Sequence, residues 1–191
     1  MKTKRKICYC IIYASLILYL LVNSAVAGQA GTQLDEKVKS FLARQRGKWV
    51  DWNVPEVDGR GLHNLIIKNN YQHVVEIGTS TGPSAIWMAW ALSKTDGKLI
   101  TIEIDEGRYR RALDNFKRAG LSEYIDARLA DAHELVKELK GPIDFVFSDA
   151  DKDWYTNYFI ALAPKLVVGG CFTAHNVRSK WGGIPEFLDY V

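Results

Sequence analysis

The stretch that most constrains the fold of this chain lies at residues 74–84 and reads Val-Val-Glu-Ile-Gly-Thr-Ser-Thr-Gly-Pro-Ser. An apolar strand runs here into a turn bracketed by two glycines, and Pro83 then suits the first position of a helix. A second apolar stretch, Leu99–Asp105, follows one helix later and carries the acidic Glu103 near its end. This order of elements predicts the beginning of a parallel sheet.

Strands and helices continue to alternate along the rest of the chain. Five strands are expected at 73–77, 98–104, 125–129, 143–148 and 167–174, and the intervening helices at 83–93, 106–118, 133–139 and 154–165. Two more helices are expected ahead of the first strand, at 34–46 and 61–68. We therefore predict an α/β fold with a Rossmann-like, doubly wound, mostly parallel sheet and helices on both faces. Residues 185–191 resemble the opening of a further helix, so we expect the last strands of such a sheet to be missing.

The first 27 residues differ in character from the rest. Four basic residues lie among the first six, an apolar run covers 7–22, and Ala25-Val26-Ala27 is a small-x-small cleavage site. These features predict a signal peptide and a secreted or periplasmic domain, with an uncleaved membrane anchor as the alternative. Residues 28–191 then form a single domain, which touches a membrane only through this N-terminal segment.

The charge balance changes once residues 1–27 are set aside. The chain has 25 Lys and Arg against 22 Asp and Glu, and the leader holds four of the basic residues and none of the acidic ones, so the remainder has 21 against 22. A nearly neutral domain with scattered charges gives no case for nucleic-acid binding. Cys171 is the only cysteine after residue 27, which excludes a disulfide within that domain.

The glycine turn and the acid that follows it predict a bound nucleoside. Gly78 and Gly82 would let the backbone approach a ligand, and the amides that open the next helix would face an anion near Ser84. Glu103 can accept hydrogen bonds from both ribose hydroxyls, although it could also be a solvated strand end. Ser80 stands where the dinucleotide fingerprint needs glycine, which disfavours an NAD-dependent oxidoreductase. S-adenosylmethionine, with one nucleoside and a small carboxylate, fits better.

Polar residues also follow two later strands of the predicted sheet. Asp149-Ala-Asp-Lys-Asp-Trp154 comes after the strand at 143–148, and His175-Asn176 comes after the strand at 167–174. Asp149, His175 and Asn176 form a possible oxygen and nitrogen ligand set for a metal. Helix capping by Asp149 or Asp151, and packing or base chemistry by His175, are the alternatives.

Five separated motifs resemble, in order and spacing, the metal-dependent class I O-methyltransferases of the catechol and caffeoyl-CoA type. The motifs are Glu76–Ser84, Thr101–Asp105, Ala130–His133, Asp149–Lys152 and Gly169–Asn176. The resemblance covers roughly residues 34–191. It implies methyl transfer from S-adenosylmethionine to a small aromatic hydroxyl acceptor, and it raises the expectation of a homodimer.

The resemblance also implies roles for individual residues. The matching cofactor-binding positions are Glu76, Gly78, Thr79, Ser84, Glu103, Ala132, His133 and Asp149. Of these, Glu103 would hold the ribose, and Ala132 and His133 would flank the adenine. Asp149 would also bind a divalent metal, and Lys152 would accept the hydroxyl proton.

The chain departs from the family at the metal site, where an Asp-Asn pair is replaced by His175-Asn176. Exchanging a carboxylate for an imidazole removes a negative charge, which disfavours Mg²⁺ and is better tolerated by Mn²⁺, Fe²⁺ or Zn²⁺. Two classes of function therefore stay open. The first is a metal-assisted O-methyltransferase, and the second is a protein that binds S-adenosylmethionine without transfer or without a metal. Trp154, Tyr155 and Trp181 could wall an aromatic acceptor, but the first two could equally be core of the next helix.

Overall fold

The computed structural model describes residues 31–49, 51–178 and 182–191. The chain divides into two compact units, residues 1–40 and residues 41–191. Residues 31–45 are helical, as predicted for 34–46. The predicted signal peptide or anchor at 1–27 lies outside the described residues. Within the described ranges, no helix has the length and apolar character needed to span a membrane.

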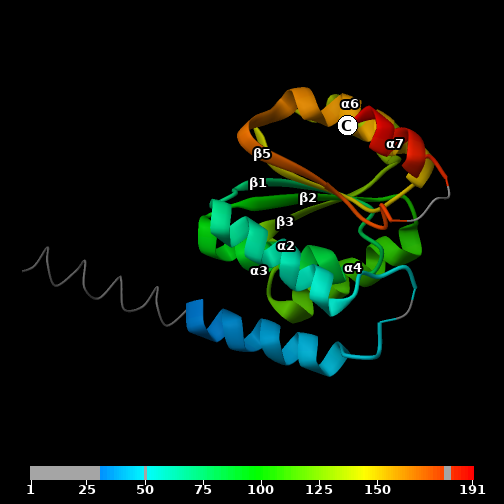
Figure 1. Ribbon diagram of the computed structural model, residues 1–191. Coiled ribbons are helices and arrows are strands. Elements are labelled where there is room, and N and C mark those ends of the chain that lie inside the picture. The colour runs from blue at the N-terminus through cyan, green and yellow to red at the C-terminus, as the bar shows by residue number, and fades with distance from the viewer. Residues whose placement is uncertain (1–30, 50, 179–181) are drawn as a thin grey trace, which may run out of the picture. The chain divides into compact units, whose positions relative to one another are not determined.

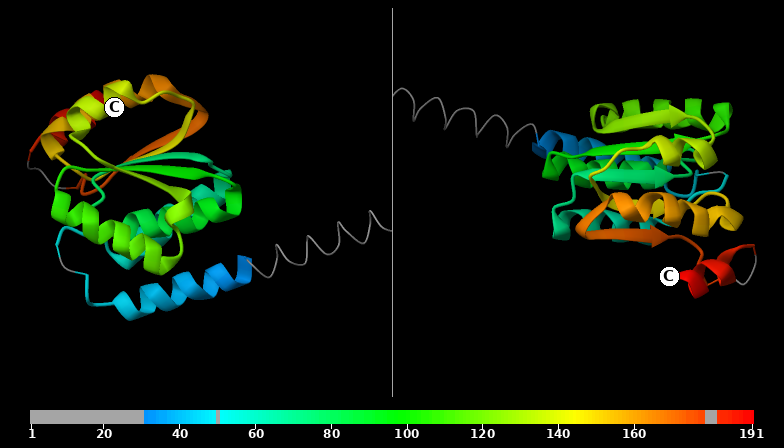
Figure 2. Two further views of the ribbon diagram at one scale, coloured as in Figure 1. Left: turned by 180° about the vertical axis from the view of Figure 1, so that it is seen from behind. Right: turned by 90° about the horizontal axis from the view of Figure 1, so that it is seen from above.

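Five parallel strands form one sheet in the second unit, in the order β3-β2-β1-β4-β5. Their bounds are β1 His73–Ile77, β2 Lys98–Glu103, β3 Ile125–Leu129, β4 Ile143–Ser148 and β5 Leu166–Ala174. The predicted strands are confirmed to within one residue at each end, and the arrows point the same way in the view from above (Figure 2). The strand order reverses between β1 and β4, and ligands of such sheets bind at the carboxyl ends beside this switch point.

Helices cover both faces of the sheet, with α2, α3 and α4 on one side and α6 and α7 on the other (Figure 1). Their bounds are α2 Glu56–Asn69, α3 Pro83–Thr95, α4 Glu106–Ala119, α5 Ala132–Glu138, α6 Tyr155–Leu162 and α7 Ile184–Tyr190. Single 3-10 turns lie at Ser122–Tyr124, Lys152–Trp154 and Ala163–Lys165.

Two helices depart notably from the prediction, whereas the other predicted bounds agree to within three residues. α2 begins five residues before the predicted Gly61, at Glu56, and includes Gly59. A Cβ at Gly59 would lie 2.2 Å from the Trp87 ring. The close packing of α2 on α3 therefore requires glycine at this position, despite its low helix propensity. The helix predicted at 154–165 is a shorter α-helix flanked by 3-10 turns, because Pro164 has no amide to continue the α-helical ladder.

The sheet is packed against helices through side chains that alternate along its strands. Val75 and Val146 point to the face where Val136 of α5, Leu162 of α6 and Phe187 of α7 complete one buried cluster. The helix predicted to open at 185 is therefore confirmed, and it belongs to the core. Burial of this kind stabilises the fold by about 25 cal/mol per Å² of apolar surface. It holds the five strands in place, and with them the carboxyl ends that carry the candidate site.

Candidate functional site

Backbone hydrogen bonds beyond the strands hold the loops at the carboxyl edge side by side. Two amides of the glycine turn donate to the Ile102 carbonyl at 3.0 and 3.1 Å. The Asp149 amide donates to the Ile77 carbonyl at 2.9 Å, and the His175 amide donates to the Ser148 carbonyl at 2.9 Å. The ends of β1, β2, β4 and β5 are thus neighbours, and the residues predicted to share one edge do share it.

The glycine turn needs its glycines for reasons internal to the protein. Gly78 and Gly82 both have φ +95°, and Ser80 between them has φ +49°. A Cβ at Gly78 would lie 2.7 Å from the Asp149 carbonyl oxygen, and one at Gly82 would lie 2.5 Å from the Phe116 ring. Both glycines are explained by backbone conformation and by close packing on the β4 loop and on α4, and close approach of a ligand to them stays a prediction.

Replacing Gly82 by alanine should destabilise the fold strongly. Positive φ and contact with Phe116 together should lower the free energy of unfolding by roughly 2–4 kcal/mol, measured by urea titration. Gly61→Ala is the matched control, because Gly61 lies within α2 with nothing within 4 Å of an added Cβ and should gain up to about 1 kcal/mol. Similar losses in both variants would contradict this explanation of the turn.

A closed network of buried polar side chains lies beneath the turn. One carboxyl oxygen of Glu76 accepts from the Ser84 hydroxyl, and the other accepts from Thr101 Oγ1 at 2.5 Å. Thr79 Oγ1 lies 2.5 Å from the same Thr101 oxygen. Glu76, Thr79 and Ser84 are each at most 4% exposed. The structure brings these three predicted cofactor residues together, but their polar atoms bond to one another, and their contact with a cofactor stays a prediction.

Stability should fall with rising pH because of Glu76. Burial, reinforced by Asp149 and Glu103, raises the pKa of Glu76 to about 8 from an ordinary value of 4.5. The folded protein keeps a proton that the unfolded chain releases, so between pH 4.5 and 8 the free energy of unfolding declines, and it levels off above pH 8. Glu76→Gln, a neutral mimic, should remove this slope in urea titrations from pH 5 to 9. The exposed Glu138→Gln should keep the slope; parallel curves for wild type and Glu76→Gln would refute the assignment.

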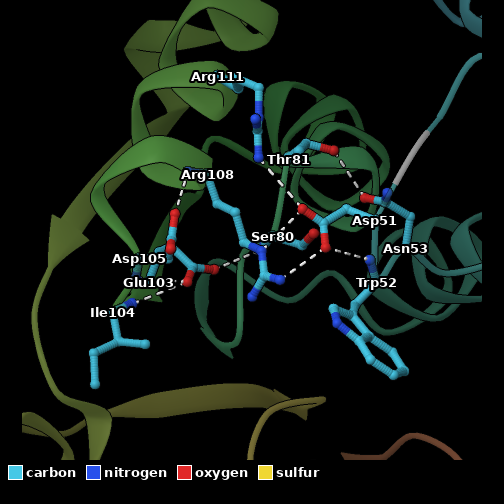
Figure 3. Close-up of polar contacts among 10 residues, drawn as sticks. All are labelled: Asp51, Trp52, Asn53, Ser80, Thr81, Glu103, Ile104, Asp105, Arg108 and Arg111. Atoms are coloured by element: carbon cyan, nitrogen blue, oxygen red, sulfur yellow. Dashed lines mark hydrogen bonds and ion pairs between the residues drawn. The ribbon is translucent and has the colours of Figure 1, made fainter.

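Glu103 lies against the glycine turn, as the spacing predicts. Its Oε2 accepts from the Ser80 amide at 2.7 Å, and its Oε1 accepts from the amides of Ile104 and Asp105 at 3.1 and 2.9 Å (Figure 3). The side chain is buried, with 6% exposure, and is not a solvated strand end. Three backbone donors fix the orientation of this carboxyl group at the position predicted for ribose hydroxyls.

A clamp that the sequence did not indicate ties residues 51–53 to this region (Figure 3). Arg108 donates to the two carboxylate oxygens of Asp51 at 3.0 and 2.8 Å, and Arg111 donates at 3.3 Å. This arginine contact lowers the pKa of Asp51, whose backbone has φ +86°. The Thr81 hydroxyl donates to Asn53 Oδ1 at 2.9 Å. The segment is therefore anchored on both sides of Trp52, which is 79% exposed.

The end of β4 carries a buried ion pair. Lys152 Nζ donates to Asp149 Oδ1 at 2.7 Å and to the Tyr155 hydroxyl at 2.6 Å. That hydroxyl in turn donates toward the carbonyls of Ser148 and His175, at 2.9 and 3.1 Å. Burial raises the pKa of Tyr155 far above its usual range, so it stays a neutral hydrogen-bonding group. Tyr155 is fully buried and positions Lys152; it does not wall an acceptor pocket.

His175 lies between two carboxylates, one of which the sequence did not indicate. Its Nε2 is 3.1 Å from Oδ2 of Asp58 on α2, with the geometry of a hydrogen bond. Its Nδ1 is 3.1 Å from Asp149 Oδ2 but lacks that geometry, and it is a buried atom with no hydrogen-bond partner among the described residues. The close side-chain contact with Asp149, followed by the contact with Asp58, raises the pKa of His175 and so favours its protonated form. Asn176 follows with φ +59°.

The adenine-flanking residues lie at the start of α5. Ala132 is largely buried, and the His133 ring stacks on Trp154 with 3.8 Å between centroids and 12° between planes. His133 Nε2 is 3.3 Å from Asp151 Oδ2. One face of His133 is thus already covered by Trp154, and adenine contact stays a prediction for this pair. Trp181 lies outside the described residues.

Comparison with known proteins identifies the family of this chain. A family model described as O-methyltransferase matches residues 28–185. The chain belongs to the O-methyltransferase family. The resemblance noted from the five motifs is confirmed by this match.

Individual relatives agree with the family assignment. The chain is 45% identical over 105 residues to a catechol O-methyltransferase of Niastella koreensis, a match that covers 53% of this chain and 47% of the relative. It is 35% identical over 141 residues to a caffeoyl-CoA O-methyltransferase of Medicago sativa, covering 69% of this chain and 56% of the relative. This chain therefore spans about half the length of these relatives.

A solved structure supports the fold and the cofactor class. The O-methyltransferase from Bacillus cereus, in complex with SAH, matches with a TM-score of 0.69 and 26% identity, covering 84% of this chain and 78% of that one. The predicted α/β fold with a parallel sheet flanked by helices is confirmed. SAH is the product that S-adenosylmethionine leaves after methyl transfer, so the family match and this complex support S-adenosylmethionine as the cofactor.

Proposed function

We propose that this protein transfers the methyl group of S-adenosylmethionine to a hydroxyl group of a small, catechol-like aromatic acceptor. The observation that carries the proposal is the Asp149–Lys152 pair at the end of β4, beside the glycine turn at the switch point. Its surroundings are polar and largely buried, which suits a group that must act on a single acceptor proton. The names of the catechol and caffeoyl-CoA relatives support the acceptor class.

The reaction needs alignment and one proton acceptor. The acceptor oxygen attacks the sulfonium methyl in line, an O–CH₃ bond forms as the S–CH₃ bond breaks, and SAH leaves as a neutral thioether. In its neutral form Lys152 has two N–H groups, and Asp149 and Tyr155 provide an acceptor for each. The remaining lone pair on Nζ can take the hydroxyl proton. Holding the two reactants in near contact supplies most of the rate enhancement.

A divalent metal is part of the proposal, with Asp149, His175 and Asn176 as the residues that would hold it. The buried Nδ1 of His175, which has no hydrogen-bond partner among the described residues, fits this role. No group of three His, Cys, Asp or Glu side chains within the described ranges could hold a metal ion, so the amide of Asn176 or non-protein oxygens would complete the set. When bound, such a metal orients vicinal oxygens and favours the ionised phenol.

A transfer assay with labelled S-adenosylmethionine tests the function. Catechol should be methylated once, and added Mn²⁺ should increase the rate over a chelator-treated sample. Resorcinol is the matched acceptor, because its hydroxyls are not vicinal and cannot bind one metal together, so it should react far more slowly. Cofactor binding without transfer to any acceptor would instead support the alternative of a non-catalytic S-adenosylmethionine-binding protein.

Export and pairing of the domain are further parts of the proposal that rest on sequence alone. A leader at residues 1–27 would make the domain secreted, periplasmic or membrane-anchored, and family resemblance favours a homodimer. Fractionation of cells that express the full chain, and light scattering of the purified protein, would test the two statements separately.

A further inference from the structure

Asp58, His175 and Asp149 form a line of side chains across the carboxyl edge. Asp58 comes from the first turn of α2, 117 residues before His175 in the chain. The side chain of His175 is 19% exposed and that of Asp149 is 16% exposed, whereas that of Asp58 is 43% exposed. His175 and Asp149 are therefore mostly removed from water, whereas Asp58 contacts His175 from the more exposed side.

The contact with Asp58 determines which ring nitrogen of a neutral His175 carries the proton. A carboxylate only accepts hydrogen bonds, so Nε2 must carry the hydrogen that Asp58 receives. In a neutral imidazole, Nδ1 then presents a lone pair. That atom is buried, and Asp149 Oδ2 lies 3.1 Å from it without a hydrogen bond between them. Two electron-pair donors at this distance need a cation between them, which is the Nδ1 proton when His175 is an imidazolium and a metal ion when that proton is displaced.

The separation suits a shared metal ion. Nitrogen and oxygen ligands lie about 2.0–2.2 Å from a transition metal, which puts neighbouring ligand atoms roughly 3 Å apart. Lys152 donates its hydrogen bond to the other oxygen of Asp149, Oδ1, and therefore leaves Oδ2 for a metal ion. Metal-bound histidines commonly donate their second N–H to a carboxylate, which is the arrangement that Asp58 provides.

We propose that Asp58 is a positioning residue that fixes His175 with its proton on Nε2, so that Nδ1 and Asp149 Oδ2 together bind a divalent transition metal in preference to Mg²⁺. An imidazole ligand suits Mn²⁺, Fe²⁺ or Zn²⁺ better than Mg²⁺, which prefers oxygen. The inference rests on the proposed function, in which that metal orients the acceptor.

Metal binding to the full chain tests the proposal, because spectroscopy can detect a nitrogen atom bound to the metal and an activity assay cannot. Mn²⁺ is titrated by electron paramagnetic resonance, with Mg²⁺ as competitor, and electron spin-echo modulation detects a directly bound nitrogen. The wild type should bind Mn²⁺ with a nitrogen signal. Asp58→Ala should weaken Mn²⁺ binding by roughly 10- to 100-fold, and Asp58→Asn, which keeps an acceptor oxygen, should weaken it less. His175→Asp should lose the nitrogen signal and gain affinity for Mg²⁺ relative to Mn²⁺.

Asp114→Ala is the control, because Asp114 is an exposed residue of α4 whose carboxylate pairs with Arg118, and it should bind metal like the wild type. Binding of S-adenosylmethionine is measured on the same samples, so loss of cofactor binding, which would defeat the proposed function, is seen separately. A folded wild type that binds no Mn²⁺, or binds it without the nitrogen signal, would overturn the metal assignment. Unchanged affinity in Asp58→Ala would overturn the role of Asp58.

Discussion

Lys152→Met should lower the turnover of methyl transfer by roughly 10²- to 10⁴-fold, the usual contribution of a positioned proton acceptor. Nζ is held 2.7 Å from Asp149 and 2.6 Å from the Tyr155 hydroxyl, so the position of this amine is fixed from two sides. The side chain lies at the end of β4, whereas Glu103 lies at the end of β2. Affinity for S-adenosylmethionine should therefore stay within about threefold of the wild type, which separates loss of chemistry from loss of binding.

The measurement is single-turnover transfer to catechol together with a cofactor titration of each variant. Removing one partner of a buried ion pair can cost about 3–5 kcal/mol of stability, so the folded state of Lys152→Met is verified by circular dichroism before assay. Lys117→Met, at an exposed position of α4, removes the same charge far from the pair and should react like the wild type. Equal losses of turnover and cofactor affinity in Lys152→Met would make Lys152 a binding residue.

Glu103→Ala should weaken S-adenosylmethionine binding by roughly 10- to 150-fold, equivalent to about 1.5–3 kcal/mol for hydrogen bonds to a charged acceptor. Three backbone amides orient the carboxylate, and the amide of Ser80 links it directly to the glycine turn. Ribose hydroxyls would donate to a carboxyl group that is already oriented, so little ordering is required on binding. Glu103→Gln keeps one acceptor oxygen and should lose less affinity.

Glu106→Ala is the matched control for this prediction. Glu106 lies three residues further along, is exposed, and pairs with Arg110 on α4. Its removal takes away the same charge without touching the turn, so calorimetry should give wild-type affinity. Wild-type affinity in Glu103→Ala as well would show that the ribose is held elsewhere.

Local sequence patterns were sufficient to predict the sheet and the edge at which its polar side chains gather. Most of the strands are short, largely apolar runs, and in a parallel sheet the ends of such runs meet at one edge. That is why Glu103, Asp149 and His175 could be grouped before their contacts were known. The family departure at His175 was also visible from sequence, because it is a single replaced residue in a matching motif.

Contacts between distant segments could not be predicted in the same way. Asp58 meets His175 across 117 residues, and Asp51 meets Arg108 across 57. The sequence around an acidic residue in a helix or loop does not show whether its carboxylate pairs with a distant side chain or only with water. The buried hydroxyl of Tyr155 was equally undetermined, because an aromatic residue after a charged loop suits both a pocket wall and a core position.

Calorimetric titration of the full chain with S-adenosylmethionine tests the central claim most directly. The titration is run with the wild type and Glu103→Ala, with and without Mn²⁺, and is followed by a catechol titration of the loaded protein. The account predicts cofactor binding by the wild type, marked weakening in the variant, and catechol binding that depends on the metal. A folded wild type that shows no heat of binding with S-adenosylmethionine would contradict it.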